Sequence, residues 1–204
     1  MTEFLTDRQV TPTLDTGHPF FLPPEPTPRD GALSLIRLVR NPTFSNLRVF
    51  PLLEQAESAR DWYVAHRHDS PDGLYSLQVF VWPPETMTKI HDHSSWGVFC
   101  CVVGAVLEER YERLDDGFEP NHAHLRMLWR GTWRKGGGVS TVLPYGGGIH
   151  SVGNSTDEPA ISVHLYGPRM GEIDGRDYDS SRDYVCDRRD DHTSKPSEHR
   201  RRKQ

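Results

Sequence analysis

An apolar run from Val98 to Val103, preceded by two closely spaced histidines, constrains the fold of this chain more than any other feature. A short, uninterrupted apolar run is typical of a strand buried on both faces. Ahead of it stand His91 and His93, separated by Asp92. Side chains two apart on a strand point the same way, close enough to bind one ion. The segment therefore predicts two metal ligands at the mouth of a packed, rigid element.

Short β-rich segments bounded by turn residues follow one another through the second half of the chain. We expect strands at Tyr75–Trp82, Val98–Leu114, His124–Arg134, Val139–Leu143 and Ala160–Tyr166. The Asp-Asp-Gly sequence at 115–117 marks a hairpin, and 17 Gly and 16 Pro suit a chain with many turns. This pattern predicts an α+β chain dominated by a β-barrel or sandwich.

Three short helices are expected before the strands. The first starts at Gly31, shows apolar residues at helical spacing, and stops at Asn41–Pro42. The second lies within 47–55 and starts at Pro51, because proline suits a first helical turn. The third covers about 58–65 and includes Trp62 and Tyr63.

The ends of the chain differ from its middle in composition. Residues 1–30 form a Pro-rich arm, residues 31–186 a single domain, and residues 187–204 a charged tail that we expect to be disordered. A length of 204 residues is sufficient for one domain with a substantial core.

Charge and hydropathy exclude several classes of partner. The formal net charge of −5 gives no electrostatic case for nucleic-acid binding. No apolar run approaches a membrane span, and the N-terminus lacks the pattern of a signal peptide. Adjacent Cys100 and Cys101 face opposite sides of a strand, so we expect reduced core cysteines. We therefore expect a cytoplasmic protein without a membrane partner.

A second motif lies between Gly138 and Asn154, and with the first it resembles the two cupin motifs. The first cupin motif is HxH, three residues, Glu, six residues, Gly; here Gly97 stands at the Glu position and Gly104 closes the spacing. In the second motif the matching residues, with one extra residue in the turn, are Gly138, Pro144, His150 and Asn154. The resemblance implies a cupin (double-stranded β-helix) barrel in which His150 meets His91 and His93.

Three histidines without a carboxylate form an informative ligand set. They leave about half of an octahedron open, which suits Fe(II) that binds both a substrate and O₂. Without an anionic protein ligand the site stays electropositive and favours a thiolate donor.

The strand after the second motif places Ser162, His164 and Tyr166 on one face. A Ser-x-His-x-Tyr strand beside a cupin site without Glu resembles the cysteine dioxygenase family of thiol dioxygenases. The resemblance covers roughly Tyr63 to Pro168 and includes the spacing from Trp82 to His91. It implies a non-heme Fe(II) enzyme that oxidises a small-molecule thiol with O₂ to the sulfinic acid. His91, His93 and His150 match its iron ligands, and Tyr166, His164 and Ser162 its catalytic relay.

The chain departs from that family at two positions. Some members carry a cysteine crosslinked to the tyrosine, whereas here the matching residue is Val98, or Gly97 with a one-residue gap, so no crosslink is expected. Members that bind cysteine grip its carboxylate with an arginine two residues beyond a tyrosine. Here Tyr63 matches the tyrosine but Ala65 replaces the arginine, and Arg67 is the nearby candidate. The substrate is accordingly cysteine, 3-mercaptopropionate, or a larger thiol or thione such as ergothioneine.

Other interpretations of these residues remain open. The same motifs suit a non-redox cupin that binds Zn²⁺ or no metal, used for ligand binding or regulation. They also suit a cupin oxygenase acting on carbon, although the Ser-x-His-x-Tyr strand argues against it. A second HxH at His122 and His124 follows a polar turn, and we expect exposed hairpin residues there. The oligomeric state stays open between monomer and dimer.

Overall fold

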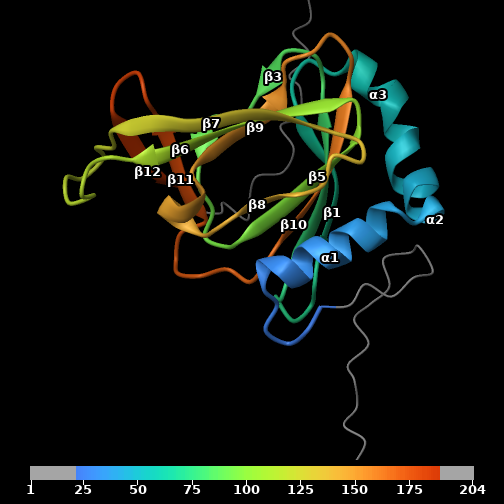
Figure 1. Cartoon of the computed structure of the whole chain (residues 1–204), viewed down its shortest axis with the longest axis horizontal. Coiled ribbons are helices and arrows are strands. Elements are labelled where there is room, and N and C mark those ends of the chain that lie inside the picture. The colour runs from blue at the N-terminus through green and yellow to red at the C-terminus, as the bar shows by residue number, and fades with distance from the viewer. Residues whose placement is uncertain (1–21, 189–204) are drawn as a thin grey trace, which may run out of the picture.

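A computed structural model describes residues 22–188, which form two antiparallel β-sheets with helices packed against one of them (Figure 1). One sheet has the order β1-β2-β10-β5-β8, with strands β1 (Tyr63–Asp69), β2 (Ser76–Trp82), β5 (Gly97–Val103), β8 (Ser140–Val142) and β10 (Ala160–Tyr166). The other has the order β12-β11-β4-β9-β6-β7, with β3 paired to β9. Its strands are β3 (Thr86–Met87), β4 (Ile90–His91), β6 (Ala105–Arg113), β7 (Leu125–Arg134), β9 (His150–Asn154), β11 (Gly175–Asp179) and β12 (Tyr184–Arg188). A mainly β fold preceded by short helices is confirmed.

The helices before β1 are short and continuous with one another. They are α1 (Pro28–Val39), α2 (Pro42–Phe44), the π-helical turn η1 (Ser45–Val49), the 3₁₀ turn η2 (Phe50–Leu52) and α3 (Leu53–Ser58), with a further 3₁₀ turn η3 (Tyr145–Gly148) before β9. Helix α1 begins three residues before the expected Gly31, because Thr27 and Asp30 form a capping box around Pro28. Residues 1–21 and 189–204 lie outside the described part, so most of the arm and of the tail remains a prediction; residues 28–30 belong to α1, and residues 187 and 188 belong to β12.

The helix expected over 58–65 is wrong beyond its first residue. Helix α3 ends at Ser58, and the chain enters β1 at Tyr63, paired antiparallel with β2. Aromatic and β-branched residues such as Trp62, Tyr63 and Val64 pack well on a pleated surface, which outweighs their weak helical spacing. The register shifts between Val64 and His66, so β1 contains a bulge.

Strand β5 of the five-stranded sheet is buried on both faces over most of its length, as the apolar run predicted. The outer face of the sheet packs against the helices, where Leu35 of α1 meets an apolar cluster that includes Val98 and Leu165. Its inner face turns towards the second sheet, where Phe80 and Phe99 meet Val106 of β6. Both sheets therefore enclose one interior, and alternate residues of β2, β5 and β10 point into it.

The strand expected over Val98–Leu114 is divided at Gly104. This residue has a φ of +68°, and a Cβ on it would lie 2.6 Å from the carbonyl oxygen of Pro159. Only glycine adopts this backbone so close to another chain segment without strain. The break lets β5 join one sheet and β6 the other, which makes it a corner of the barrel.

The hairpin β11–β12 was not predicted. Its sequences, Gly175–Asp179 and Tyr184–Arg188, contain few apolar residues and resemble loops. Their backbone groups are satisfied by pairing with each other and with β4, which carries His91. The hairpin therefore supports the segment that holds the first histidine motif.

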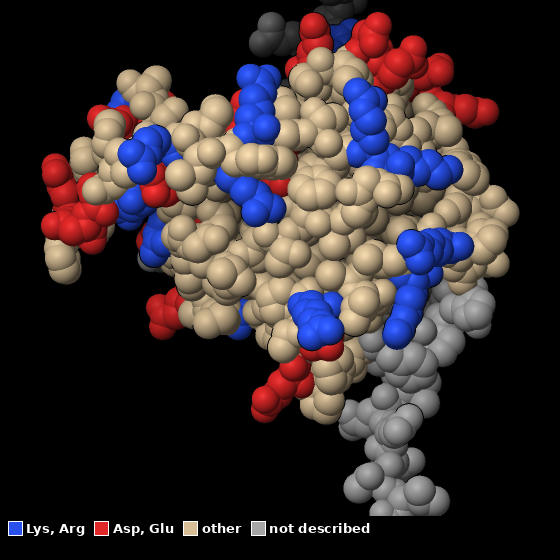
Figure 2. All heavy atoms as spheres, in the orientation of Figure 1, with Lys and Arg blue, Asp and Glu red and all other residues tan. Residues whose placement is uncertain are grey.

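The surface shows no broad basic patch on the face drawn in Figure 2. Lysine and arginine side chains stand singly or in small groups among neutral ones, and acidic side chains gather at the upper edge and the left tip. Within residues 22–188, no helix has both the length and the apolar character needed to cross a bilayer. The three cysteines are free, and Cys100 and Cys101 are buried on opposite faces of β5.

Candidate metal centre

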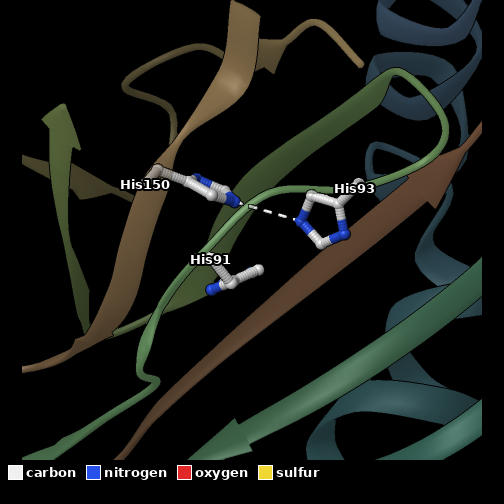
Figure 3. A group of neighbouring side chains, drawn as sticks. All are labelled: His91, His93 and His150. Carbon is white, nitrogen blue, oxygen red and sulfur yellow. Dashed lines mark hydrogen bonds between the residues drawn. The ribbon is translucent and has the colours of Figure 1, made fainter. Parts of the chain in front are cut away.

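Three histidines from distant parts of the chain converge inside the barrel (Figure 3). His91 on β4 and His150 at the start of β9 are directly paired in register, and His93 lies in the loop before β5. One ring nitrogen from each lies within 4.8 Å of the others, and the Nε2 atoms of His93 and His150 are 3.1 Å apart. The structure thus brings together the three residues that the two motifs indicated.

The donor set fits a metal ion. Burial, reinforced by the neighbouring imidazoles, lowers the pKa of His91 and of His93 well below the ordinary value, so both rings are neutral donors. His91 Nδ1 lies 2.8 Å from the Lys89 carbonyl oxygen, which can only accept, so the lone pair is on Nε2. Ring nitrogens of neutral histidines that converge at one buried position can coordinate a metal cation placed between them.

Asp92 holds the loop between the first two histidines. Its side chain is fully buried, and it accepts hydrogen bonds from the Arg176 backbone N–H at 2.6 Å and the Tyr178 hydroxyl at 2.7 Å. The Arg188 guanidinium donates to its carbonyl oxygen. All three donors belong to the hairpin β11–β12, whose importance for the site the sequence motifs did not indicate.

A hydrogen-bonded relay approaches the three histidines from β10. Trp82 Nε1 lies 2.7 Å from Ser162 Oγ, Ser162 Oγ lies 2.7 Å from His164 Nε2, and His164 Nδ1 lies 3.2 Å from the Tyr166 hydroxyl. The Tyr166 ring is 5.0 Å from the His93 ring, centroid to centroid. The relay adds Trp82 to the three residues expected from the sequence.

Trp82 determines the direction of these hydrogen bonds. An indole N–H can only donate, so Ser162 Oγ accepts from it. The partners of Ser162 Oγ within residues 22–188 are Trp82 and His164, so its own O–H donates to His164 Nε2. The ring proton of His164 is then on Nδ1 and is donated to the Tyr166 oxygen. The Tyr166 O–H is left to donate into the cavity.

Burial keeps the relay in one protonation state near neutral pH. It lowers the pKa of His164 to about 3, so the ring stays neutral. It also raises the pKa of Tyr166, so the phenol keeps its proton. The assigned directions therefore hold throughout the physiological pH range.

Gly97 is the residue that faces Tyr166. The two are paired in register between β5 and β10, and a Cβ on Gly97 would lie 3.2 Å from two carbons of the tyrosine ring. Val98 instead points into the outer apolar cluster. Of the two alternatives for the crosslinking position, the structure therefore favours Gly97, and no thiol faces the tyrosine.

A cavity of about 1290 Å³ opens onto the three histidines and Tyr166. An aromatic wall of Trp62, Phe80 and Trp82 borders it, with ring centroids 5.5–6.0 Å apart. Arg67 also lines the cavity, and it pairs with Asp69 at 2.9 Å.

Tyr63 was expected to bind substrate, but it lies on the side of β1 that faces away from the cavity. It packs against the outer apolar cluster and does not line the cavity. The bulge between Val64 and His66 reverses the alternation of β1, so Val64 and Arg67 both face the cavity. Spacing from the family motif could not anticipate this reversal.

The other HxH pair is separate from the metal centre. His122 makes an isolated bridge with Tyr184, and His124 pairs with Asp183 at 3.0 Å in an exposed position. The one group of metal-ligating side chains found among residues 22–188 is His91, His93 and His150.

Comparison with known proteins agrees with this geometry. A family model described as cysteine dioxygenase type I matches residues 46–181. Together with the antiparallel two-sheet barrel, this match confirms the cupin prediction.

Two of the similar solved structures are described as cupin or cupin-like proteins, and a third is an oxalate oxidase. A cupin 2 conserved barrel domain protein from Salinispora arenicola CNS-205 is 17% identical, with 52% of this chain and 73% of that chain covered and a TM-score of 0.36. A cupin-like protein from Thermotoga maritima msb8 is 17% identical, with 52% and 68% covered and a TM-score of 0.36. Oxalate oxidase in complex with the substrate analogue glycolate is 17% identical, with 52% and 51% covered and a TM-score of 0.40.

Proposed function

The chain belongs to the cysteine dioxygenase type I family, and on that premise we propose that it is an Fe(II)-dependent dioxygenase of a small-molecule thiol. The overall change is RSH + O₂ → RSO₂H. Two S–O bonds form, the O–O bond breaks, sulfur is oxidised, O₂ is reduced, and the thiol proton ends on the sulfinic acid. The observation that carries the proposal is the Tyr166 hydroxyl, which is oriented by a relay and lies beside three converging histidines.

His91, His93 and His150 are the proposed ligands. Bound Fe(II) would supply open coordination positions for a thiolate and O₂ and would mediate the transfer of electrons from sulfur to O₂. Three neutral imidazoles place no negative charge directly on the ion, which favours a substrate in the thiolate form.

Tyr166 is proposed to donate a hydrogen bond to a reacting atom at the inner end of the cavity. Its O–H is available because the oxygen already accepts from His164 Nδ1. Because buried groups fix the direction of the relay hydrogen bonds, the Tyr166 O–H does not need to reorient when charge develops on sulfur or oxygen. His164 and Ser162 act through Tyr166 as positioning residues.

The aromatic wall makes one side of the inner cavity apolar. Phe80 contacts the His164 ring at 4.4 Å between centroids and stacks on Trp82. Apolar surroundings lower the local dielectric constant, which strengthens the hydrogen bond from Tyr166 and limits side reactions of O₂.

Arg67 is the proposed contact for a substrate carboxylate. Its present partner, Asp69, is a half-exposed neighbour on the same strand, and such surface pairs contribute little stability. An incoming carboxylate can replace Asp69 at small cost. Cysteine, 3-mercaptopropionate and the zwitterionic thione ergothioneine all carry this group, and the cavity volume accommodates each of them.

An oxygen-electrode screen tests the function. Iron-loaded protein is supplied with cysteine, 3-mercaptopropionate, ergothioneine or the carboxylate-free thiol cysteamine, and the products are identified by mass spectrometry. We expect thiol-dependent O₂ uptake with stoichiometric sulfinate, and no uptake by His150→Ala. Zinc at full occupancy in protein purified from cells, with no O₂ uptake by the iron-loaded form, would refute the proposal in favour of a non-redox cupin.

The screen also tests Arg67. In Arg67→Ala, KM for a carboxylate-bearing substrate should rise by about 10-fold, the equivalent of one charged hydrogen bond. Turnover of cysteamine, which has no carboxylate, serves as the internal control and should not change.

A further inference from the structure

A fully buried carboxylate stands directly behind one of the proposed ligands. Glu108 lies on β6, shares the inward face of that strand with Val106, and has no exposed surface. Its Oε1 lies 3.1 Å from Nδ1 of His150, the ring nitrogen that faces away from His93. Neither sequence motif includes Glu108. The sequence does contain one indication of its role: Glu108 is a charged residue at a strand position where the alternating pattern calls for an inward-facing apolar residue.

The other oxygen of Glu108 is held by two donors from neighbouring strands and one from its own strand. Oε2 accepts from Ser140 Oγ at 2.7 Å, Trp133 Nε1 at 2.9 Å and Arg110 Nη2 at 3.3 Å. Arg110 also donates to Ser140 Oγ and to the Thr141 carbonyl oxygen, which ties β6 to β8. The carboxylate is thus fixed in orientation before any ligand arrives.

This arrangement leaves His150 one tautomer. The indole of Trp133 and the guanidinium of Arg110 can only donate, so the carboxylate group acts as an acceptor. Nδ1 of His150 must therefore carry the ring proton. Nε2 is thereby the ring nitrogen left to bind a metal ion, and it is this atom that lies 3.1 Å from His93 Nε2.

We propose that Glu108 is a positioning residue that fixes the tautomer and ring orientation of His150 and strengthens its nitrogen as a metal donor. The proposal rests on the metal centre of the proposed function. Carboxylates behind ligating histidines act in this way in other metal sites, and their loss typically weakens metal binding by about 10–100-fold. Here Gly97 takes the place of the cupin Glu, whereas Glu108 supplies a negative charge one step behind the ligands.

Two readouts test this role without measuring turnover. In metal-free protein labelled with ¹⁵N-histidine, NMR should report the Nδ1–H tautomer for His150. In Glu108→Gln the amide can present either an acceptor or a donor, so this tautomer should lose its dominance. Anaerobic competition with a chelator should show Fe(II) affinity reduced by about 10–100-fold.

Glu109→Gln is the matched control. Glu109 is the next residue on β6 and points to the other side, where it accepts from Tyr111 and Ser151. Its substitution should leave Fe(II) affinity unchanged. Ser140→Ala is the second test variant, because it removes a donor to Glu108 without touching His150, and we expect a smaller loss of affinity.

Wild-type affinity and an unchanged His150 tautomer in folded Glu108→Gln would overturn the proposal. If circular dichroism shows that Glu108→Gln does not fold, unchanged affinity in Ser140→Ala would overturn it instead. Failure of the proposed function is distinguishable, because it appears as absent O₂ uptake by wild-type protein and leaves the tautomer and affinity comparisons intact.

Discussion

The indole nitrogen of Trp82 lies 2.7 Å from the hydroxyl oxygen of Ser162, and this single contact orients the side-chain hydrogen bonds that run from Trp82 to Tyr166. The two residues are 80 positions apart in the chain and sit on adjacent strands. Because tryptophan cannot accept a hydrogen bond, the relay cannot reverse while the contact is intact. Three buried side chains and the half-buried Tyr166 thereby form one relay with a fixed direction.

Replacing Trp82 with phenylalanine should reduce turnover while the metal content stays the same. The ring still fills the core, but Ser162 loses the donor that orients it, so Tyr166 O–H can turn towards His164. We expect turnover to fall by about 10-fold and the free energy of unfolding to fall by about 1–3 kcal/mol. Steady-state kinetics and urea denaturation measure both. Trp129→Phe, at a half-exposed tryptophan, is the control, and equal effects of the two variants would contradict the assigned relay.

Removing the Tyr166 hydroxyl should separate O₂ consumption from product formation. Tyr166→Phe keeps the ring beside His93 and leaves all three histidines in place, so metal content should be unchanged. We expect turnover to fall by about 10–100-fold, with more O₂ consumed per sulfinate formed. An oxygen electrode combined with mass spectrometry gives that ratio. A variant with normal rate and normal ratio would remove Tyr166 from the mechanism.

A methyl group at Gly97 should disturb the tyrosine specifically. The added Cβ would lie 3.2 Å from the Tyr166 ring and 3.1 Å from Val142 Cγ2, so these side chains must shift by a few tenths of an ångström. Gly97→Ala should therefore slow turnover but retain metal, and the effect should shrink in a Tyr166→Phe background. Gly146→Ala is the control, because a Cβ there meets open space. Additive effects of the two changes would argue against coupling.

Acid should destabilise the metal-free protein through His164. Burial lowers its pKa from 6.5 to about 3, so between these values the unfolded chain binds a proton that the folded protein does not. The free energy of unfolding therefore falls as the pH drops through this interval, and this contribution levels off below it. Urea titrations at a series of pH values should show a shallower decline for His164→Phe than for wild type. Parallel curves would show that the group is not buried as a neutral ring.

Most of the barrel and the three histidines could be predicted from the sequence, because their signals are local. Alternating or continuous apolar runs identify strands such as Ala160–Tyr166, and motif spacing selects His150 from the other histidines. These patterns reflect burial on fixed faces of a strand, which a neighbouring element does not easily override.

The features of the fold and of the site that the sequence did not predict depend on pairing between distant segments of the chain. Whether Trp62 and Tyr63 belong to a helix or adjoin a strand is decided by β2, which supplies the ladder for β1. The bulge in β1 then decides which side chains reach the cavity: Arg67, already a candidate from the sequence, lines it together with Trp62, whereas Tyr63 does not. The polar hairpin β11–β12 is stable because it extends a sheet, and its own sequence contains little apolar signal. Such effects arise from partners that are distant in the chain.

The register pair between His91 and His150 determines when the metal site can form during synthesis and folding of the chain. During synthesis, the first histidine motif leaves the ribosome well before β9 exists, and it offers two donors at most. Contacts of such long sequence separation form late, because loop closure must come first. The chain can therefore bind the metal ion at full affinity only after the barrel has closed, so a metal-loaded molecule is one that has completed folding.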